Sequence, residues 1–420
     1  MLRWLKLCRS LFIGIAGIIC WKICSLLVTN KHQKLNLSKV SGLTSNRILH
    51  IQLDSVGDVM MATPIFRAVK NRFVNSNEVL PQEVQPQEVQ PRIDILLRPG
   101  NKLLLMNNPN INTILTLDNN ILKTINTILG LRKTSYNIVI DYSSSFYSGW
   151  ISFITGSKCR LGVMHNSKIG LFSIRDFGFF YTHKIKDMGM HLIDMWANEV
   201  KMLNCDGQDS RMEIYPSPKE FDKIEHLFNT INGSNEEVQP QKVIVIHPNA
   251  KWSPKRWPID KFAKLTSELI ALGYKVILVG TSRDELSLRA IASDHQTRCK
   301  RSDVIIKRSD VIIKVVTDLS LLELAALIKR ADLFIGNDSG PAQISISVGT
   351  PSIVLFGPVL PARSGPKDNK HIVLFKNIGC SPCPLYYTKD KCIRGDNECL
   401  KLIEVDEVLE AVSKLIKKCS

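Results

Sequence analysis

The sequence predicts an α/β fold built from two doubly wound parallel sheets. Short apolar runs, typical of strands buried on both faces, alternate with helical segments whose apolar residues fall on one side. This alternation occurs twice, in residues 47–235 and in residues 242–403, on either side of a polar break. Alternating strands and helices are typical of parallel sheets covered by helices on both faces, so each half is expected to form one domain.

The expected strands are the apolar runs themselves. In the first half they lie at residues 48–53, 93–97, 114–117 and 137–141. In the second half they lie at residues 243–247, 275–279, 311–316, 333–335 and 352–356. Residues 404–420 are expected to form a closing amphipathic helix, because their apolar residues recur at helical spacing.

Residues 331–358 are the most informative segment. An apolar strand runs into a polar turn at 336–340, and a short helix is expected to follow. Pro341 would take its first position, with Asp338 or Ser339 as the cap. The free backbone N–H groups at such a helix start favour a phosphate. An ordinary strand–helix connection without a ligand is the alternative.

A second segment, residues 47–73, has a similar plan. Its strand enters a turn at residues 54–57, and Asp58 lies where the turn ends. A helix is expected next, with Thr63 as its cap and Pro64 at its first position.

Two other strands of the second half also end in polar loops. The strand at 243–247 breaks into a loop that carries Lys255 and Arg256, and the strand at 275–279 is soon followed by Ser282. Open parallel sheets bind ligands beyond the carboxyl ends of their strands, so these loops are candidates for binding an anion.

Together the four segments resemble glycosyltransferase family 9, the ADP-heptose:lipopolysaccharide heptosyltransferase-like proteins. The resemblance is carried by Leu-x-Ser-x-Gly-Asp…Thr-Pro at 53–64, His-Pro…Lys-Arg-Trp-Pro at 247–258, Gly-Asn-Asp-Ser-Gly-Pro at 336–341 and Gly-Thr-Pro…Leu-Phe-Gly-Pro at 349–358. It implies the GT-B architecture, in which two Rossmann-like domains face each other across a cleft. It also implies that the first domain binds the acceptor and the second the nucleotide-sugar.

The resemblance further implies an inverting transferase that requires no metal or other cofactor. Its partners would be a nucleotide-sugar, with ADP-heptose as the expected donor, and a lipid-linked glycan of lipopolysaccharide or a related envelope glycan. Sugar transfer needs a base for the acceptor hydroxyl and positive charge for the departing diphosphate. Asp58 matches the family's base and Lys255 its cation. Considered alone, Asp58 could simply cap a turn and Lys255 could be a solvated surface lysine.

The expected donor-binding residues follow the same motifs. They are Gly57, Asn249, Ser282, Asn337, Asp338, Ser339, Gly340, Pro341 and Gln343. Gln343 stands where many relatives carry histidine, and a glutamine can donate a hydrogen bond to phosphate but cannot carry positive charge.

The N-terminus predicts a membrane anchor at residues 1–29, a hydrophobic helix followed by a tether at 30–46. Residues 11–28 form an apolar run with basic residues on both sides, just long enough to span a bilayer. A helix lying in the plane of the membrane is the alternative. The expected location is the cytoplasmic face of the bacterial inner membrane. The formal net charge of +16 suits an anionic membrane or substrate, and no basic patch interleaved with aromatics predicts nucleic-acid binding.

Two low-complexity insertions interrupt the pattern. A proline- and glutamine-rich repeat occupies residues 81–91 and has an echo at 237–241, typical of an extended linker. A seven-residue unit is copied in tandem at 300–313, and one copy is expected to supply a strand.

Eleven cysteines without the spacing of a disulfide framework favour a reducing compartment. Four of them cluster in the sequence, Cys380, Cys383, Cys392 and Cys399. The Cys-x2-Cys pair with two later cysteines could bind a structural zinc, and free thiols or a redox-sensitive pair are the alternative.

The sequence thus predicts a membrane-associated glycosyltransferase that moves a sugar, heptose first, onto an envelope glycan. The second hypothesis is a catalytically weak or inactive relative that serves as a membrane-bound sugar-binding or assembly component.

Overall fold

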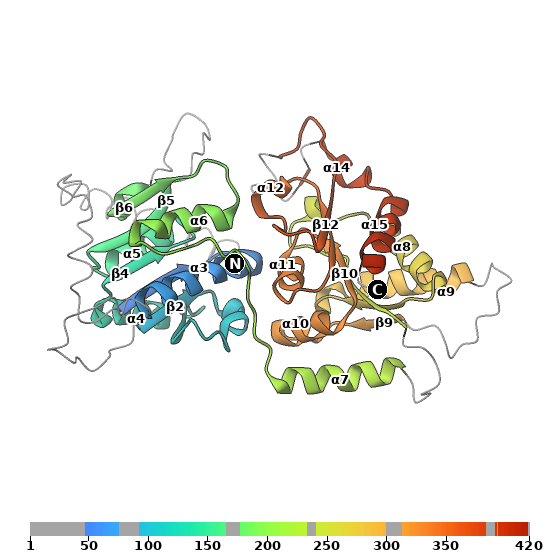
Figure 1. Cartoon of the computed structure of the whole chain (residues 1–420), viewed down its shortest axis with the longest axis horizontal. Helices are drawn as coiled ribbons and strands as arrows, with labels where there is room; N and C mark the ends of the chain where they lie inside the picture. Colours follow the sequence, from blue (N-terminus) through green and yellow to red (C-terminus); the bar gives the residue numbers. More distant parts are fainter. Residues whose placement is uncertain are drawn as a thin grey trace, which may run out of the picture. The chain divides into compact units, whose positions relative to one another are not determined.

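The computed structural model describes residues 47–74, 92–164, 177–232, 241–299, 313–383, 391–392 and 394–418 (Figure 1). The predicted anchor and tether, the repeat at 81–91, its echo and most of the tandem copy lie outside these residues. Residues Thr44–Ser420 form one compact unit by their internal contacts. No helix within the described ranges is both long enough and apolar enough to cross a membrane.

The first half forms a parallel six-stranded sheet in the order β3-β2-β1-β4-β5-β6. Its strands are β1 (Arg47–Gln52), β2 (Arg92–Leu97), β3 (Thr113–Thr116), β4 (Ile138–Asp141), β5 (Cys159–Met164) and β6 (His183–Lys186). Its helices are α3 (Val56–Val74), η1 (Pro99–Leu105), α4 (Ile121–Thr134), α5 (Phe146–Ile154), η2 (Phe177–Phe180), α6 (Leu192–Val200), η3 (Lys201–Leu203) and α7 (Pro218–Asn232).

The second half forms another parallel six-stranded sheet, in the order β12-β11-β10-β7-β8-β9. Its strands are β7 (Val243–His247), β8 (Lys275–Val279), β9 (Ile313–Val316), β10 (Leu333–Asn337), β11 (Ser352–Phe356) and β12 (His371–Phe375). Its helices are η4 (Ser253–Lys255), α8 (Ile259–Ala271), η5 (Ser282–Asp284), α9 (Glu285–Cys299), α10 (Leu321–Arg330), α11 (Gly340–Ser347), α12 (Pro361–Ser364), α14 (Glu398–Lys401) and α15 (Val405–Lys418).

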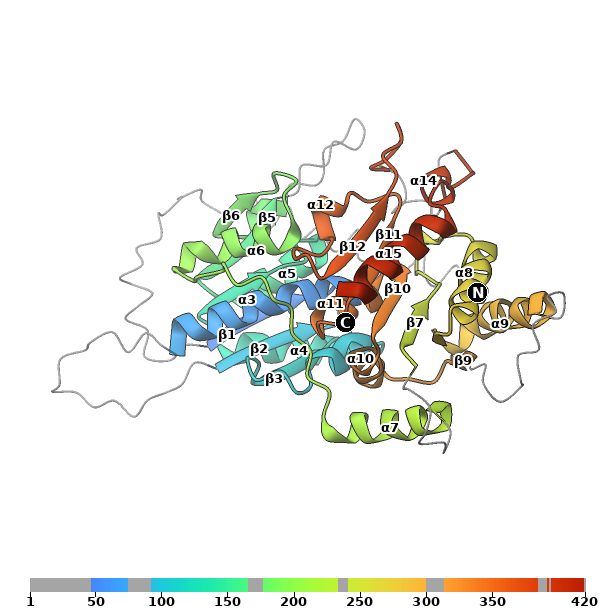
Figure 2. The ribbon, with the colours of Figure 1, turned by 45° about the vertical axis from the view of Figure 1, so that its right-hand side comes forward.

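Both sheets have the strand order of a dinucleotide-binding fold, since the strands of each half follow the sequence 3-2-1-4-5-6. The central strands are buried along their whole length, which explains their continuous apolar runs. The C-terminal helix α15 lies beside α8 and against β11 and β12 (Figure 2), so its apolar stripe completes the second core. The predicted α/β architecture is confirmed.

Three strands were not predicted, namely β5, β6 and β12. Three of the four residues in β6 are polar, so β6 has no apolar run. β12 does contain an apolar run, at residues 372–375, which the prediction passed over. Both are edge strands with partly exposed residues. β5 lies inside the sheet, between β4 and β6, but Arg160 and Gly162 interrupt its apolar residues.

The prediction that Thr63 caps a helix starting at Pro64 is wrong. α3 begins at Val56, and both residues lie inside it. Pro64 has no N–H to donate to the carbonyl of Met60 four residues earlier, and the Thr63 hydroxyl donates to that carbonyl instead, at 2.7 Å. Proline is therefore tolerated within this helix.

One further prediction needs adjustment. Pro341 is the second residue of α11, because the helix already begins at Gly340. Of the tandem copy at 300–313 only Ile313 is described, where it begins β9, so the strand expected from that copy stays a prediction for the other residues. The helix α7 contacts α10 of the second half, through Arg330–Glu225 and Lys223–Glu323 ion pairs, although it precedes the predicted second domain.

Candidate active site

Each sheet has a switch point where its strand order reverses. It lies between β1 and β4 in the first sheet and between β7 and β10 in the second. Helices that follow the two strands leave on opposite faces, and the crevice between them is where open parallel sheets bind ligands. The predicted catalytic residues follow these strands, with Asp58 after β1 and Lys255 after β7.

Asp58 lies in the first turn of α3. Its Oδ2 accepts hydrogen bonds from the backbone N–H of Ser55 at 3.0 Å and from the Ser55 hydroxyl at 2.6 Å. Its Oδ1 accepts no hydrogen bond from the residues that the structure describes. Asp58 therefore caps the helix with Oδ2, which is the alternative role that the sequence suggested. Its Oδ1 can still accept a hydrogen bond from another group.

The turn that carries Asp58 is tied to the end of β4. The side-chain Oε1 of Gln52 accepts from the Asp54 N–H at 3.1 Å and from the Ser143 hydroxyl at 3.0 Å. The Ser143 hydroxyl oxygen in turn accepts from the Leu53 N–H at 2.7 Å. These bonds link both strands of the switch point and fix the turn before α3.

Asp141, the last residue of β4, is fully buried beside this turn. Its Oδ1 accepts from the N–H groups of Ser143 and Ser144, both at 3.1 Å, and its Oδ2 accepts from the Tyr181 hydroxyl at 2.7 Å. Burial raises the pKa of Asp141 to about 7, although the hydrogen bond from Tyr181 acts in the opposite direction. The sequence prediction did not include Asp141, because only its burial distinguishes it from other aspartates.

The start of α11 presents unused donors at the second switch point. The N–H groups of Ala342 and Gln343 both bond to the carbonyl of Ser339, at 3.1 and 3.3 Å. The N–H groups of Ser339 and Gly340 donate no hydrogen bond within the described residues, and the Ser339 hydroxyl is buried without a partner there. Three unpaired polar groups at the positive end of a helix favour an anion.

Lys255 reaches the same place from η4. Its Nζ lies 2.5 Å from Asp338 Oδ2, and the two side chains are only 15% and 7% exposed. Lys255 is therefore not a solvated surface lysine. Asp338 directly precedes the N-cap residue of α11, so the ion pair holds a cation beside the unused N–H groups.

The remaining predicted donor residues have different environments. Asn337 is buried, and it accepts from the Trp257 N–H at 2.9 Å and donates to the Pro248 carbonyl at 2.7 Å. Its amide thus holds the loop that carries Lys255. Asn249 is buried in that loop, whereas Ser282 is exposed at the end of the neighbouring strand, β8.

The first turns of α3 and α11 pack against each other. A Cβ atom on Gly340 would lie 2.8 Å from the Cβ of Val56, so no larger residue fits there without a shift. A Cβ atom on Gly57 would lie 3.2 Å from the Cγ of Gln343. Because Asp58 follows Gly57, the structure brings the turn of the predicted base beside the helix start that holds the predicted anion site.

Gln343 itself is buried at this contact. Its side-chain amide donates to the carbonyl of Ser364 at 2.8 Å. The structure therefore gives the donor nitrogen of Gln343 a protein partner, and contact with a phosphate stays a prediction.

The sequence prediction missed a second set of contacts near the site. Arg363 forms two hydrogen bonds with the carboxylate of Asp187, at 2.9 and 2.7 Å, and a third with the Met190 carbonyl at 2.6 Å. The neighbouring His191 ring lies 2.9 Å from the Gly365 carbonyl, and burial lowers its pKa. These partners are more than 170 residues apart, so no local pattern could reveal them.

The chain is similar in sequence to known glycosyltransferases. A sequence model of glycosyltransferase family 9 (heptosyltransferase) matches residues 126–393. The chain is 24% identical over 369 residues to lipopolysaccharide heptosyltransferase 3 of Escherichia coli, covering 86% of this chain and 96% of that protein. It is 27% identical over 334 residues to lipopolysaccharide heptosyltransferase 1 of Campylobacter coli, covering 74% and 86%.

Solved structures share the fold. ADP-heptose lps heptosyltransferase II of E. coli aligns with a TM-score of 0.64 at 20% identity, covering 89% of this chain and 99% of that one. A glycosyl transferase of family 9 from Veillonella parvula aligns with a TM-score of 0.66 at 21% identity, covering 89% and 97%. The overall fold of this chain is therefore shared with these solved structures.

Proposed function

The chain belongs to glycosyltransferase family 9 and is a glycosyltransferase, and from this premise we propose that it transfers heptose from ADP-heptose to the core of lipopolysaccharide. One observation carries the proposal. The α3 turn with Asp58 packs against the α11 start, where Lys255 and free N–H groups favour an anion. A base and a phosphate site side by side are what transfer of a sugar from a nucleoside diphosphate requires.

In the proposed mechanism Asp58 accepts the proton of the acceptor hydroxyl through Oδ1. Its Oδ2 stays bonded to Ser55, which fixes the direction of the carboxylate. The hydroxyl oxygen attacks the anomeric carbon of the donor from the face opposite the diphosphate, so the configuration inverts. The proton passes to Asp58 as the new glycosidic bond forms.

The departing diphosphate gains negative charge in the same step. Lys255 and the N–H groups of Ser339 and Gly340 would neutralise that charge, with the Ser339 hydroxyl as a further donor. Lys255 would then exchange part of its contact with Asp338 for the phosphate oxygens. No step of this mechanism requires a metal.

Purified protein tests the proposal directly. Incubation with ADP-heptose and a lipopolysaccharide acceptor truncated before the heptose is expected to release ADP and add one heptose to the acceptor, detected by mass spectrometry. ADP release without a modified acceptor would refute the proposed acceptor. A protein that binds ADP but neither releases ADP from the donor nor modifies the acceptor would favour the second candidate, an inactive sugar-binding relative. The glutamine at position 343, which cannot carry positive charge, supports that candidate.

We also propose that the enzyme works at the cytoplasmic face of the inner membrane. One face of α4 supports a lipid contact, since Ile121, Leu122, Ile125 and Leu129 are 44–67% exposed. The helix contains basic residues but no acidic residue, which suits an anionic lipid surface. Arg47, the first described residue, donates to the Thr134 carbonyl at the end of α4 at 2.9 Å. The predicted tether would therefore join the fold beside this helix.

Vesicle binding tests this contact in chains that lack residues 1–29. Replacing both Ile125 and Leu129 by glutamate is expected to lower sedimentation with phosphatidylglycerol vesicles at least fivefold. The matched control replaces Leu272 and Leu286, which are 62% and 86% exposed in the second half, by glutamate. Equal loss in both pairs, or equal binding to neutral phosphatidylcholine vesicles, would contradict an anionic lipid contact at α4. Fractionation of cells with and without residues 1–29 tests the anchor itself.

A further inference from the structure

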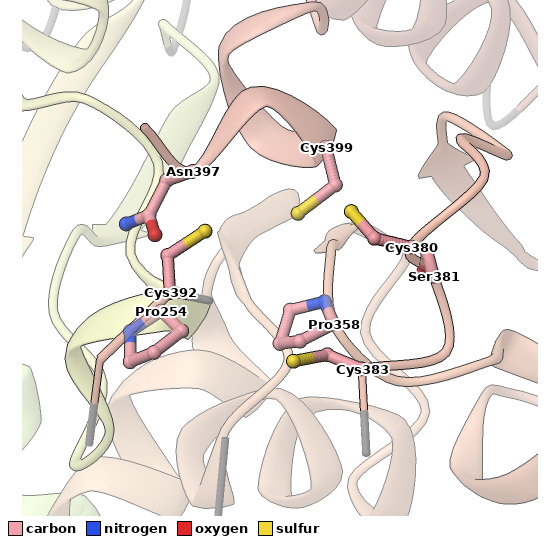
Figure 3. A pocket seen from close by; sticks show the side chains of 8 residues that line it. All are labelled: Pro254, Pro358, Cys380, Ser381, Cys383, Cys392, Asn397 and Cys399. Atoms are coloured by element: carbon pink, nitrogen blue, oxygen red, sulfur yellow. The ribbon is translucent and has the colours of Figure 1, made fainter. Parts of the chain in front are cut away.

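Four cysteines line one small cavity in the second half. The cavity has a volume of about 20 Å³, and its lining consists of Pro254, Pro358, Cys380, Ser381, Cys383, Cys392, Asn397 and Cys399. In Figure 3 the sulfur atoms of Cys380, Cys392 and Cys399 point toward the same space, whereas Cys383 lies beyond the ring of Pro358. Such a volume has room for about one water molecule or one metal ion.

The backbone around these cysteines is fixed by hydrogen bonds. The N–H of Cys383 donates to the Pro358 carbonyl at 2.8 Å, and the carbonyl of Cys392 accepts from the Gly395 N–H at 3.1 Å. The Ser381 hydroxyl donates to the Gly357 carbonyl at 2.7 Å. The Cys380–Cys383 segment is thereby held against the loop that follows β11.

The four thiols also lie close to one another, since Cys392, Cys380 and Cys383 all interact electrostatically with Cys399. Thiolates packed this closely repel one another unless a cation lies between them, and such a cation would take them as ligands.

We propose that Cys380, Cys383, Cys392 and Cys399 together bind one tetrahedral metal ion, with zinc as the expected ion. The Cys-x2-Cys pair and two further cysteines from another segment are the ligand set of structural zinc sites. As they stand, no three Cys, His, Asp or Glu side chains within the described ranges are close enough to coordinate a metal. The Sγ atoms must therefore rotate inward about χ1 from their fixed backbone to reach about 2.3 Å from the ion. Binding replaces four thiol protons by one divalent cation.

Arg394 would compensate the excess negative charge of this site. Four thiolates and one divalent cation carry a net charge of −2, and the Arg394 guanidinium lies beside Cys380. Arg394 is itself held by Asp396 at 3.3 Å and Glu398 at 2.6 Å. Such second partners orient the ligands of metal sites.

The site would also position the catalytic loop, an inference that rests on the proposed function. Pro254 lines the cavity and directly precedes Lys255. The Asn397 amide lies 3.5 Å from the Ser253 carbonyl of the same turn. A metal that joins the cysteine segments would therefore stiffen the turn from which Lys255 reaches Asp338.

Metal analysis of the purified full-length chain tests the proposal. About one zinc per chain is expected by elemental mass spectrometry, and Cys392→Ser or Cys399→Ser should lower the content at least tenfold. Cys159→Ser and Cys205→Ser are matched controls, since both residues are buried free cysteines of the first half, and their zinc content should stay unchanged. Loading the protein with cobalt should give the intense absorption of tetrahedral cobalt thiolates.

A wild-type chain that contains no metal and binds none on titration under reducing conditions would overturn the proposal. So would an unchanged metal content in both cluster variants. Iron at the same stoichiometry, lost in the same variants, would support the four-thiolate site and replace zinc as its ion. The readouts are independent of sugar transfer, so a failed transferase assay leaves them interpretable.

Discussion

The two sheets carry opposite charges at their switch points. The first sheet has Asp58 after β1 and the buried Asp141 at the end of β4. The second sheet has Lys255 after β7 and the open start of α11 after β10. The strand order of the two sheets is the same. The helix that follows the first switch strand differs between them, because α3 begins with a carboxylate cap and the second sheet continues into a loop with a lysine. One topology thus supplies an acidic site in one half and a cationic site in the other. The contact between α3 and α11 makes the two sites neighbours.

The largest effect is expected for the acidic site. Asp58→Asn should reduce transfer at least ~100-fold, the usual scale for loss of a general base, while ADP binding and folding persist. The asparagine oxygen can still accept from Ser55, so the cap is kept. Steady-state kinetics and thermal unfolding measure both properties.

Glu220→Gln is the matched control for that substitution. Glu220 caps α7 as Asp58 caps α3, since its carboxylate accepts from the Ser217 N–H at 2.7 Å, but it lies away from both switch points. This variant should keep wild-type turnover. If Asp58→Asn retained more than about half of the wild-type rate, Asp58 would be a cap only.

Loss of the cationic site should be the second largest effect. Lys255→Met should slow transfer roughly tenfold to a hundredfold and weaken ADP binding, because the diphosphate loses a charged partner. It also leaves the buried Asp338 without its ion pair, so a lower free energy of unfolding is expected. Lys261→Met is the control, since Lys261 pairs with Glu404, which directly precedes α15. Unchanged ADP affinity in Lys255→Met would separate Lys255 from the donor site.

The two switch points should also respond to pH with opposite sign. Burial raises the pKa of Asp141 from its usual value near 4 to about 7, so the native state binds the extra proton in that window. Its contribution to stability is therefore full at low pH and is lost as the pH rises from 4 to 7. Burial lowers the pKa of His247 to about 4, so its neutral ring destabilises the native state as the pH falls from 6.5 to 4.

Denaturant unfolding at pH 5 and pH 6 measures the two slopes. From pH 5 to pH 6, Asp141 should lower the wild-type free energy of unfolding by up to about 1.4 kcal/mol, and His247 should raise it by a similar amount. Asp141→Asn should abolish that decrease, and His247→Gln should abolish that increase. Wild-type slopes in both variants would show that neither group keeps its shifted pKa in solution.

The smallest effect is expected at the contact between the two sites. Gln343→Ala should weaken ADP binding by about 1 kcal/mol, the value of one neutral hydrogen bond, and Gln343→His should keep or tighten it, most clearly at low pH. Ser347→Ala is the control, because Ser347 donates to the Gln343 carbonyl from the same helix. Calorimetric titration with ADP decides the question. Three equal affinities for wild type, Gln343→Ala and Gln343→His would place Gln343 outside the donor site.

The sequence by itself determined the buried frame of both sheets. Strands such as β1, β4, β7 and β11 were predicted within a residue or two, because a strand covered on both faces must be apolar along its whole length. The motifs around Asp58 and Asp338 could also be recognised in the sequence, because each lies in the loop directly after an apolar strand. The edge strand β6 was not predicted, because three of its four residues are polar and leave no apolar run. The edge strand β12 was overlooked although residues 372–375 are all apolar.

Only the tertiary structure decided how these residues are used. The pairing of Lys255 with Asp338, the burial that raises the pKa of Asp141 and the packing of Gly340 on Val56 join residues that are distant in the chain. Thr63 shows that a local pattern can also mislead at short range. The pattern predicted a helix start at Pro64, but the Thr63 hydroxyl donates to the carbonyl that Pro64 leaves unpaired, and α3 continues through both residues. Local patterns report which faces must be buried, whereas partners and electrostatic environments depend on what the whole chain packs against them.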